Sequence, residues 1–233
     1  MMPADALTPE SLAAMIDHTF LKPYGTCHDL ENLCREAREY HFAMVAINPA
    51  EVEYCAILLQ GTGVRVGAAI GFPLGQNTTE VKIFEIRDAI SRGASEIDMV
   101  INIRALQNHD DAHVQREIDL MAQVCRDGRI ISKVILETCF LTDQEKETVC
   151  RMAISSGVDF VKTSTGFGTA GANVHDVRLM REVVGHQAGV KASGGIRTLA
   201  SVLDLIHAGA TRIGTSSGAA IVEDLRKHLS NTL

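Results

Sequence analysis

Short apolar segments rich in β-branched residues alternate with longer amphipathic segments eight times along the 233 residues. A short run of the first kind predicts a buried strand, and apolar residues at helical spacing predict a helix. The predicted strands cover residues 16–19, 42–47, 64–70, 96–101, 132–137, 158–163, 190–193 and 212–214. The predicted helices cover residues 27–40, 50–60, 78–92, 111–126, 143–155, 174–185, 198–208 and 218–230.

This alternation restricts the topology. Strands joined by helical crossovers run parallel, because the crossover returns the chain to the edge from which it started. No linker, low-complexity segment or shift in composition divides the chain. We therefore expect one domain over residues 1–233 with an α/β fold, a single (β/α)8 TIM barrel, which typically needs about 250 residues. A doubly wound open sheet is the alternative, but the first strand lacks the glycine fingerprint of such sheets.

Capping residues mark several helix starts. Asn48 before Pro49 predicts a cap followed by a proline at the first helical position. Thr142 and Glu145 have the spacing of a capping box. Thr8, Pro9 and Glu10 predict an extra N-terminal helix before the first strand, which can cover one end of the barrel.

The charge balance and the cysteines bear on partners and location. The formal net charge is −7 at pH 7, and an acidic surface repels nucleic acid and anionic membranes, so we expect neither as a partner. No segment is long and apolar enough to cross a bilayer, and we expect no signal peptide at the N-terminus. Six cysteines without a CxxC pair are typical of reduced, packed thiols and predict a cytoplasmic protein.

Three of the seven lysines lie inside predicted core strands. Because alternate residues of a strand face opposite sides, the apolar residues that pack under the helices turn Asp98, Lys133 and Glu137 towards the barrel axis. Lys162 and Lys191 lie in the sixth and seventh strands. Buried charges are costly unless paired, so the cluster is either a structural ion-pair network or an active site. We favour an active site, because barrel enzymes place their chemistry at the C-terminal ends of strands.

Lys162 and Lys191 are expected to be neighbours, since their strands are adjacent. Repulsion between two ammonium groups and burial both lower the pKa of a lysine. A neutral lysine amine attacks carbonyl carbons and forms a Schiff base. The sequence therefore predicts a Schiff-base lysine, with Asp98 and Lys191 moving protons.

Turns rich in glycine and hydroxyl groups follow the last three strands, at 163–166, 193–197 and 214–218. Thr165 lies in the first of them and is a predicted substrate-binding residue. Glycine lets backbone N–H groups approach an anion, and barrel enzymes often bind phosphate after strands seven and eight. We therefore expect a phosphate site here. Arg197 either adds a charge to it or is a surface residue of the next helix.

Other candidates carry less weight. His109 and His113 have the spacing of a metal-binding pair, but no third ligand is evident, so we expect no metal site. We interpret His18, beside Asp17, as part of an Asp–His–Thr network that holds the end of the first strand. The cysteines carry no nucleophile signature.

The segment FVKTSTG at 160–166 resembles the deoxyribose-phosphate aldolase family, class I aldolases with a TIM-barrel fold. Further segments that look like this family follow in the same order over nearly the whole chain. They are IDHTFLKP at 16–23, IGFPLG at 70–75, GASEIDMVIN at 93–102, KVILET at 133–138, VKASGGIR at 190–197 and GTSS at 214–217.

The resemblance implies roles for these residues. Lys162 would be the Schiff-base lysine, Lys191 would lower its pKa, and Asp98 would take part in proton transfer. No metal or organic cofactor would be required, the partners would be small phosphorylated sugars and aldehydes, and the assembly would be a homodimer or homotetramer. The substrate-binding positions would be Asp17, Lys133, Gly166, Gly194, Gly195, Ser216 and Ser217.

The reaction implied by the resemblance is the reversible cleavage of 2-deoxy-D-ribose 5-phosphate to acetaldehyde and D-glyceraldehyde 3-phosphate, a step in deoxyribonucleoside breakdown. The lysine amine attacks the sugar aldehyde, and the resulting iminium accepts electrons while the C2–C3 bond breaks. A base takes the proton of the 3-hydroxyl group, and the enamine is then protonated and hydrolysed.

The chain departs from some family members at three places. Phe167 stands where some carry a lysine after the glycine, which would remove one phosphate contact. Ala46 stands where some carry a cysteine, which would reduce inactivation by aldehydes. The chain ends in Leu233 rather than in a tyrosine that reaches the site.

Three other functions are considered. A second Schiff-base lyase on the same barrel would prefer another phosphorylated aldehyde. A non-catalytic barrel would bind sugar phosphate without needing a lysine of depressed pKa. A metal-dependent aldolase is disfavoured, because no histidine cluster is present.

Overall fold

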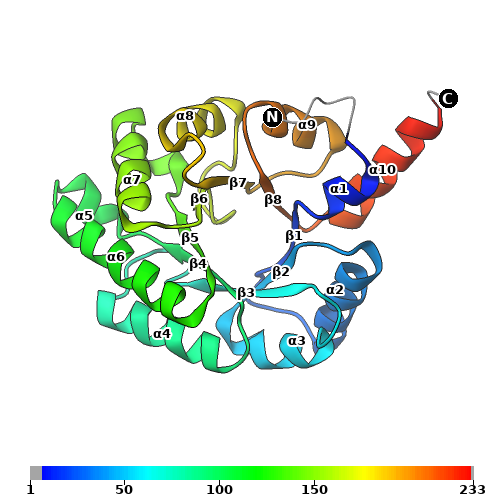
Figure 1. The fold of residues 1–233 in the computed structure, drawn as a ribbon, viewed down its shortest axis with the longest axis horizontal. Coiled ribbons are helices and arrows are strands. Elements are labelled where there is room, and N and C mark those ends of the chain that lie inside the picture. The colour runs from blue at the N-terminus through cyan, green and yellow to red at the C-terminus, as the bar shows by residue number, and fades with distance from the viewer. Residues whose placement is uncertain (1–6, 232–233) are drawn as a thin grey trace.

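In the computed structural model, which describes residues 7–231, eight parallel strands close into one barrel and the helices surround it (Figure 1). The strands are β1 Ile16–Phe20, β2 Met44–Ile47, β3 Arg65–Ile70, β4 Glu96–Val100, β5 Ile131–Ile135, β6 Phe160–Lys162, β7 Gly189–Ser193 and β8 Arg212–Thr215. They pair in sequence order, and β8 pairs with β1. The predicted (β/α)8 TIM barrel is confirmed.

The helices lie outside the strands, with two short 3-10 turns among them. They are α1 Pro9–Ala13, α2 Cys27–Tyr40, η2 Pro49–Glu51, α3 Val52–Leu58, α4 Thr79–Ser91, α5 Ile103–Gln107, α6 Asp111–Gly128, η3 Thr138–Phe140, α7 Asp143–Ser156, α8 Val174–Val184, α9 Leu199–His207 and α10 Gly218–Ser230.

Two of the three helix starts predicted from capping residues have the expected side-chain cap. Thr8 caps α1 and shares a capping box with Ser11, and Thr142 shares one with Glu145 at the start of α7. The extra helix α1 lies beside α10 and buries Leu12 completely (Figure 1). Because α1 leads directly into β1, it lies at the end of the barrel where the strands begin.

Some predicted boundaries differ from the structure. The helix expected over 50–60 begins with the 3-10 turn η2, and the predicted cap is wrong, because the side chain of Asn48 accepts no hydrogen bond from a backbone N–H group there. The strand expected over 158–163 is shorter, because the N–H group of Val158 donates to Ala153 and closes the end of α7. Helix α5 was not predicted; the side chain of Asn102 starts it by accepting from the N–H group of Ala105.

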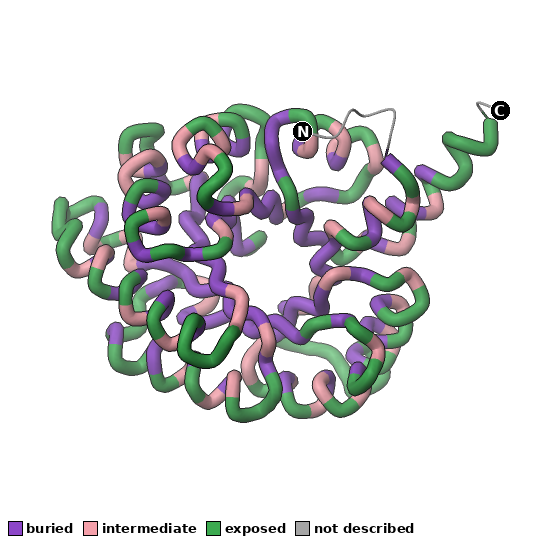
Figure 2. The backbone as a smooth tube through the Cα atoms, in the orientation of Figure 1, coloured by how far each residue is buried: buried purple, intermediate pink, exposed green. Residues whose placement is uncertain are grey.

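The apolar core lies between the strands and the helices, and buried residues follow the strands around the barrel (Figure 2). Ile97, Val134 and Val161 are fully buried members of this core. Their neighbours in sequence therefore face the barrel axis, since side chains alternate along a strand. The predicted inward orientation of the charged residues follows from this packing.

The strand register brings the charged residues together. Asp98 of β4 pairs with Lys133 of β5, and Lys162 of β6 pairs with Lys191 of β7. Directly paired residues of parallel strands project to the same side of the sheet. Glu137 was expected to follow the same alternation, but β5 ends at Ile135, so Glu137 belongs to the turn beyond the strand.

Among residues 7–231, no helix is both long and apolar enough to cross a membrane. The predictions about a signal peptide and a C-terminal tyrosine involve residues 1–6 and 232–233, which lie outside the described residues.

Candidate active site

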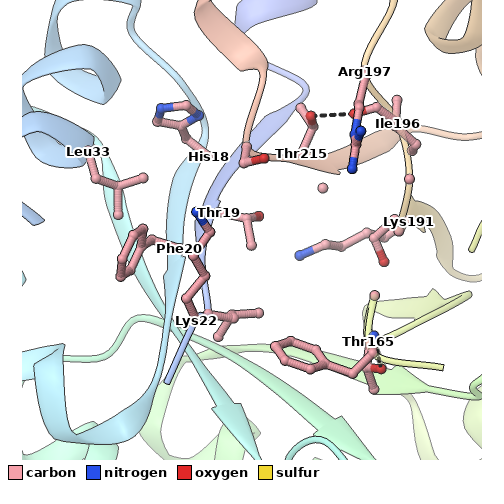
Figure 3. Close-up of a pocket in the computed structure, with 18 of the residues that line it drawn as sticks. His18, Thr19, Phe20, Lys22, Leu33, Thr165, Lys191, Ile196, Arg197 and Thr215 are labelled. Atoms are coloured by element: carbon pink, nitrogen blue, oxygen red, sulfur yellow. Dashed lines mark hydrogen bonds between the residues drawn. The ribbon is translucent and has the colours of Figure 1, made fainter. Parts of the chain in front are cut away.

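A cavity of about 510 Å³ opens at the C-terminal ends of β1, β6, β7 and β8. Lys162 and Lys191 line it, although their side chains are almost completely buried. Figure 3 shows the amine of Lys191 pointing into its open centre. The turns after β6, β7 and β8 and the first part of α2 complete the walls. The structure thus places the two strand lysines at the bottom of an accessible cavity.

Asp98 accepts hydrogen bonds from three lysines at the bottom of the cavity. Its Oδ2 atom accepts from Lys162 Nζ at 2.8 Å and from Lys191 Nζ at 2.7 Å. Its Oδ1 atom accepts from Lys133 Nζ at 2.8 Å. One buried carboxylate therefore bridges the two lysines of the cavity and connects them to a third beneath it. The predicted catalytic residues Lys162, Lys191 and Asp98 form one hydrogen-bonded group.

A further layer of ion pairs lies below. Asp17 pairs with Lys191 at 2.5 Å and with Arg212 at 2.7 Å. Glu96 pairs with Lys133 and, at 3.3 Å, with Arg212. We call the whole group the axial cluster; its members are Asp17, Glu96, Asp98, Lys133, Lys162, Lys191 and Arg212.

The axial cluster holds four bases and three acids, all at most 8% exposed at the side chain. Buried charges are tolerated when they are balanced, so this composition favours the loss of one proton. Burial lowers the pKa of Lys162, and repulsion from Lys191 adds to this, while Asp98 opposes it; the pKa is about 8. Lys162 is therefore the base from which the proton is lost most readily.

Lys133 and Asp98 keep their charge. Burial disfavours the ammonium group of Lys133, but attraction to Asp98 and Glu96 outweighs it and raises the pKa. Burial also disfavours the carboxylate of Asp98, yet the three lysines hold its pKa well below the usual range. Two lysines on neighbouring strands thus behave differently: Lys133 is a fixed cation, and Lys162 is able to become a nucleophile.

The turns predicted to bind phosphate lie around the cavity. Its lining includes Thr165, Gly166, Gly194, Gly195 and Ser216. The turn after β8 is held by the Thr215 hydroxyl group, which donates to the carbonyl of Ile196 at 2.7 Å (Figure 3).

Three of the predicted substrate-binding residues do not line the cavity. Asp17 and Lys133 lie beneath it within the axial cluster. Ser217 is the N-cap residue of α10 and also lies outside the lining. Asp17 and Lys133 thus adjoin the two lysines from below, while the cavity wall is built by the turns.

Glu137 has a contact that the sequence did not predict. Its carboxylate accepts from the backbone N–H group of Thr165 at 3.3 Å and from the Thr165 hydroxyl group. The same hydroxyl oxygen accepts from the N–H group of Phe167 at 3.0 Å. Burial raises the pKa of Glu137. The turn after β5 therefore fixes the turn after β6. The sequence predicted an inward position for Glu137 but gave no signal of its contact with Thr165.

His18 lines the cavity, but the predicted network with Asp17 is wrong. Its Nε2 atom and the carboxylate of Glu36 on α2 lie 2.8 Å apart. Asp17 instead pairs with Lys191 and Arg212 on the other face of β1. The alternation of side chains along β1 separates His18 from Asp17.

The histidines considered as metal ligands belong to no candidate metal site. Within the described part of the chain, one group has the geometry of a metal site: Asp143, His175 and Asp176. Lys146 Nζ already lies 3.0 Å from Asp143 and 2.7 Å from Asp176. An ammonium group thus occupies the place of a cation there, outside the barrel.

The chain resembles known aldolases over nearly its whole length. A model of the DeoC/LacD family of aldolases matches residues 11–224. A deoxyribose-phosphate aldolase of Bacteroides thetaiotaomicron is 68% identical over 226 residues, which is 96% of this chain and 95% of the relative. One of Bacillus subtilis is 54% identical over 213 residues, covering 91% of this chain and 95% of the relative.

A solved structure gives the same result. A tetrameric deoxyribose phosphate aldolase from Aeropyrum pernix superposes with a TM-score of 0.89 and 34% sequence identity. The match covers 96% of this chain and 95% of that one. The sequence comparison and the structural comparison therefore indicate the same family over nearly the whole chain.

Proposed function

The chain belongs to the DeoC/LacD family of aldolases, and from its site we propose that it cleaves 2-deoxy-D-ribose 5-phosphate reversibly to acetaldehyde and D-glyceraldehyde 3-phosphate. One observation carries the proposal. Lys162 lies on the floor of the cavity with a pKa of about 8, bonded to a carboxylate that it shares with Lys191. Such an amine is a nucleophile for aldehydes near neutral pH.

In the proposed mechanism, the neutral amine of Lys162 adds to C1 of the open-chain sugar. Loss of water from the carbinolamine leaves an iminium ion, whose positive nitrogen accepts the electron pair of the C2–C3 bond. The proton of the 3-hydroxyl group goes to a base, and C3 leaves as the aldehyde of D-glyceraldehyde 3-phosphate. C2 of the enamine then takes up a proton, and water releases acetaldehyde and Lys162.

The hydrogen bonds of Asp98 suggest the path of the protons. Its Oδ2 atom contacts both Lys162 and Lys191, so a proton is able to pass between the two amines through one carboxylate. We assign Lys191 as the proton donor and acceptor next to Lys162. Asp98 is a carboxylate before and after each transfer and stabilises positive charge on either nitrogen, because its pKa is lowered by the lysines around it.

The turns supply the proposed phosphate site. Gly166, Gly194 and Gly195 line the cavity with left-handed backbone, where the absence of a side chain leaves N–H groups free to approach an anion. Ser216 precedes α10, whose N-terminus adds partial positive charge. Binding the phosphate away from C1 would orient the sugar for attack.

Reductive trapping tests the proposal directly. Borohydride in the presence of 2-deoxy-D-ribose 5-phosphate is expected to leave a covalent adduct on Lys162, seen by intact-protein mass and peptide mapping. Lys162→Ala is expected to give none. Absence of an adduct on the folded wild-type protein would contradict the Schiff-base mechanism.

A substrate panel separates this aldolase from another Schiff-base lyase. The 2-deoxy sugar phosphate is expected to react faster than other phosphorylated aldehydes. A faster reaction with a different phosphorylated aldehyde would assign the site to another lyase of the same mechanism.

We also propose that the chain acts in the cytoplasm as one domain that assembles into a homo-oligomer. All six cysteines are free thiols, as in a reducing compartment. The Aeropyrum pernix relative is tetrameric, which supports an assembly. Light scattering is expected to give a mass of at least two chains; a monomer would contradict this part of the proposal.

A further inference from the structure

The rim of the cavity is uneven in charge. Phe167 after β6 is 51% exposed and packs edge-to-face on Phe72, with ring centroids 5.4 Å apart, so this side of the rim is apolar. Two exposed cations also line the cavity: Lys22 after β1 and Arg197 before α9. Figure 3 shows them on different sides of the open centre. A dianion entering the cavity therefore meets positive charge from two directions.

Neither cation has its charge neutralised by a direct partner. Within residues 7–231, the side chains of Lys22 and Arg197 make no hydrogen bond or ion pair. Lys22 acts on the carboxylate of Asp29 only through longer-range attraction, and that carboxylate is hydrogen-bonded by the N–H and hydroxyl groups of Thr26 at 2.7 and 2.9 Å. The charge of Lys22 thus remains available to a ligand.

Two aromatic rings hold the amine of Lys22 near the cavity. Its Nζ atom lies 6.0 Å from the ring centre of Phe20 and 5.7 Å from that of Tyr24. Cation–π contacts at an exposed site are weak, so they restrict the side chain without neutralising it. A phosphate oxygen offers a stronger, charge-assisted hydrogen bond. The amine would therefore leave the two rings and bind a phosphate in the cavity.

The barrel topology places Lys22 beside the phosphate turns. β1 is hydrogen-bonded to β8, so the segment after β1 flanks the turn after β8 that contains Ser216. Arg197 follows the Gly194–Gly195 turn after β7. A phosphate bound at the N–H groups of these two turns therefore has Arg197 on one side and Lys22 on the other.

We propose that Lys22 is a substrate-binding residue that contacts the phosphate monoester opposite Arg197 and so determines the preference for phosphorylated over unphosphorylated sugars. This rests on the proposed function. Lysine binds phosphate as a point charge and needs no fixed geometry, which suits a side chain restrained only by two rings.

The test compares two substrates in Lys22→Gln, Lys22→Arg and the control Lys227→Gln, which removes an exposed lysine of α10. The readout is kcat/KM for 2-deoxy-D-ribose 5-phosphate divided by kcat/KM for 2-deoxy-D-ribose. We expect Lys22→Gln to lower this ratio about tenfold and Lys22→Arg to restore most of it, because a charge-assisted bond is lost and regained. Lys227→Gln is expected to leave the ratio unchanged.

Inorganic phosphate is the second probe. As a competitive inhibitor of the wild-type enzyme it is expected to bind about tenfold more weakly to Lys22→Gln, for the same reason. An unchanged ratio, or an equal loss on both substrates, would overturn the assignment of Lys22 while leaving the aldolase intact. Absence of cleavage and of a trapped adduct in the wild type would instead reject the proposed function.

Discussion

At the residue scale, the charge of Lys162 depends on opposing effects of its surroundings. Burial and Lys191 disfavour the ammonium form, and Asp98 favours it. A pKa of about 8 leaves roughly a tenth of the amine neutral at pH 7 and roughly nine tenths at pH 9.

The rate of Schiff-base formation should follow this titration. We expect the rate of adduct trapping with substrate to rise about tenfold between pH 7 and pH 9, with a midpoint near 8. Quenching with borohydride after fixed reaction times at each pH measures it. A rate that stays constant over this range would mean that the amine is not the titrating nucleophile.

Asp98→Asn tests two effects of this carboxylate, one on the pKa of Lys162 and one on the stability of the fold. Because Asp98 raises the pKa of Lys162, its loss should shift the midpoint of trapping to lower pH. Three buried ammonium groups would also lose their shared partner, so the free energy of unfolding should fall by about 3–5 kcal/mol. Asp88→Asn, which removes a carboxylate from the exposed pair with Arg92, is the control and should change stability by less than about 1 kcal/mol. A midpoint that stays in place or rises would contradict the role of Asp98.

At the scale of elements, the C-terminal turns of neighbouring strands hold one another. Gly194 has a φ of +89°, and a Cβ atom there would lie 3.0 Å from the Cα of Gly171 and 3.4 Å from that of Gly166. Glu137 joins the turn after β5 to the turn after β6 through Thr165. The shape of the cavity therefore depends on contacts between turns as well as on each turn.

Gly194→Ala should distort the backbone at the proposed phosphate site. We expect a loss of about 2–3 kcal/mol in unfolding free energy and a higher KM for the phosphorylated substrate. Gly61→Ala is a matched control, with a φ of +76° but no atom within 4 Å of the added Cβ. It should cost only about 1 kcal/mol, since backbone strain is its sole effect. Equal losses in urea unfolding would show that the contact between the turns is unimportant.

Glu137→Ala should release the turn after β6. The N–H and hydroxyl groups of Thr165 would lose their buried acceptor, at a cost of about 1–3 kcal/mol. KM for the phosphorylated substrate should rise more than kcat falls, because the turn and not the nucleophile is displaced. Glu137→Gln keeps a carbonyl acceptor and should recover most of the loss. A fall in kcat at unchanged KM would contradict this role.

At the scale of the whole molecule, the axial cluster determines how stability responds to acid. Burial raises the pKa of Asp17, but Lys191, Lys133 and Arg212 outweigh it, so the pKa is lowered, as it is for Asp98. A carboxylate whose pKa is lower in the folded state stabilises the fold above its unfolded pKa of 3.8. This contribution is lost as the pH falls below that value.

The two carboxylates should therefore lower the free energy of unfolding in urea by about 2 kcal/mol between pH 7 and pH 3. Asp98→Asn should show a smaller fall, because one of the two carboxylates is absent. Equal stability of the wild type at both pH values would exclude the lowered pKa values.

A second whole-molecule prediction concerns metals. Because the proposed electron acceptor is an iminium formed by Lys162, activity should be unchanged after dialysis against a chelator. Loss of activity that zinc or magnesium restores would contradict the Schiff-base mechanism.

The barrel fold and the inward position of several charged side chains followed from the sequence alone. Both depend on local patterns, which are the alternation of strands with helices and the period of two along each strand. Eight alternations of strand and helix permit few closed topologies, and the period of two along a strand placed Asp98 and Lys133 on the inner face. The same alternation turns Glu96 inward, although nothing local indicates its partner. The motif segments identified the family, since their order is preserved over nearly the whole chain.

Only the tertiary structure decided which charges pair. Glu96 and Arg212 lie 116 residues apart in the chain, and Asp17 meets Arg212 across the closure of the barrel. Fully buried Lys82 pairs with Glu117 outside the barrel, so a buried lysine need not belong to the site. Lys162 and Lys133 are both strand lysines, and their different pKa shifts arise from the number of carboxylates that surround each one. Sequence patterns determine the face on which a side chain lies, whereas long-range packing determines its neighbours and therefore its charge.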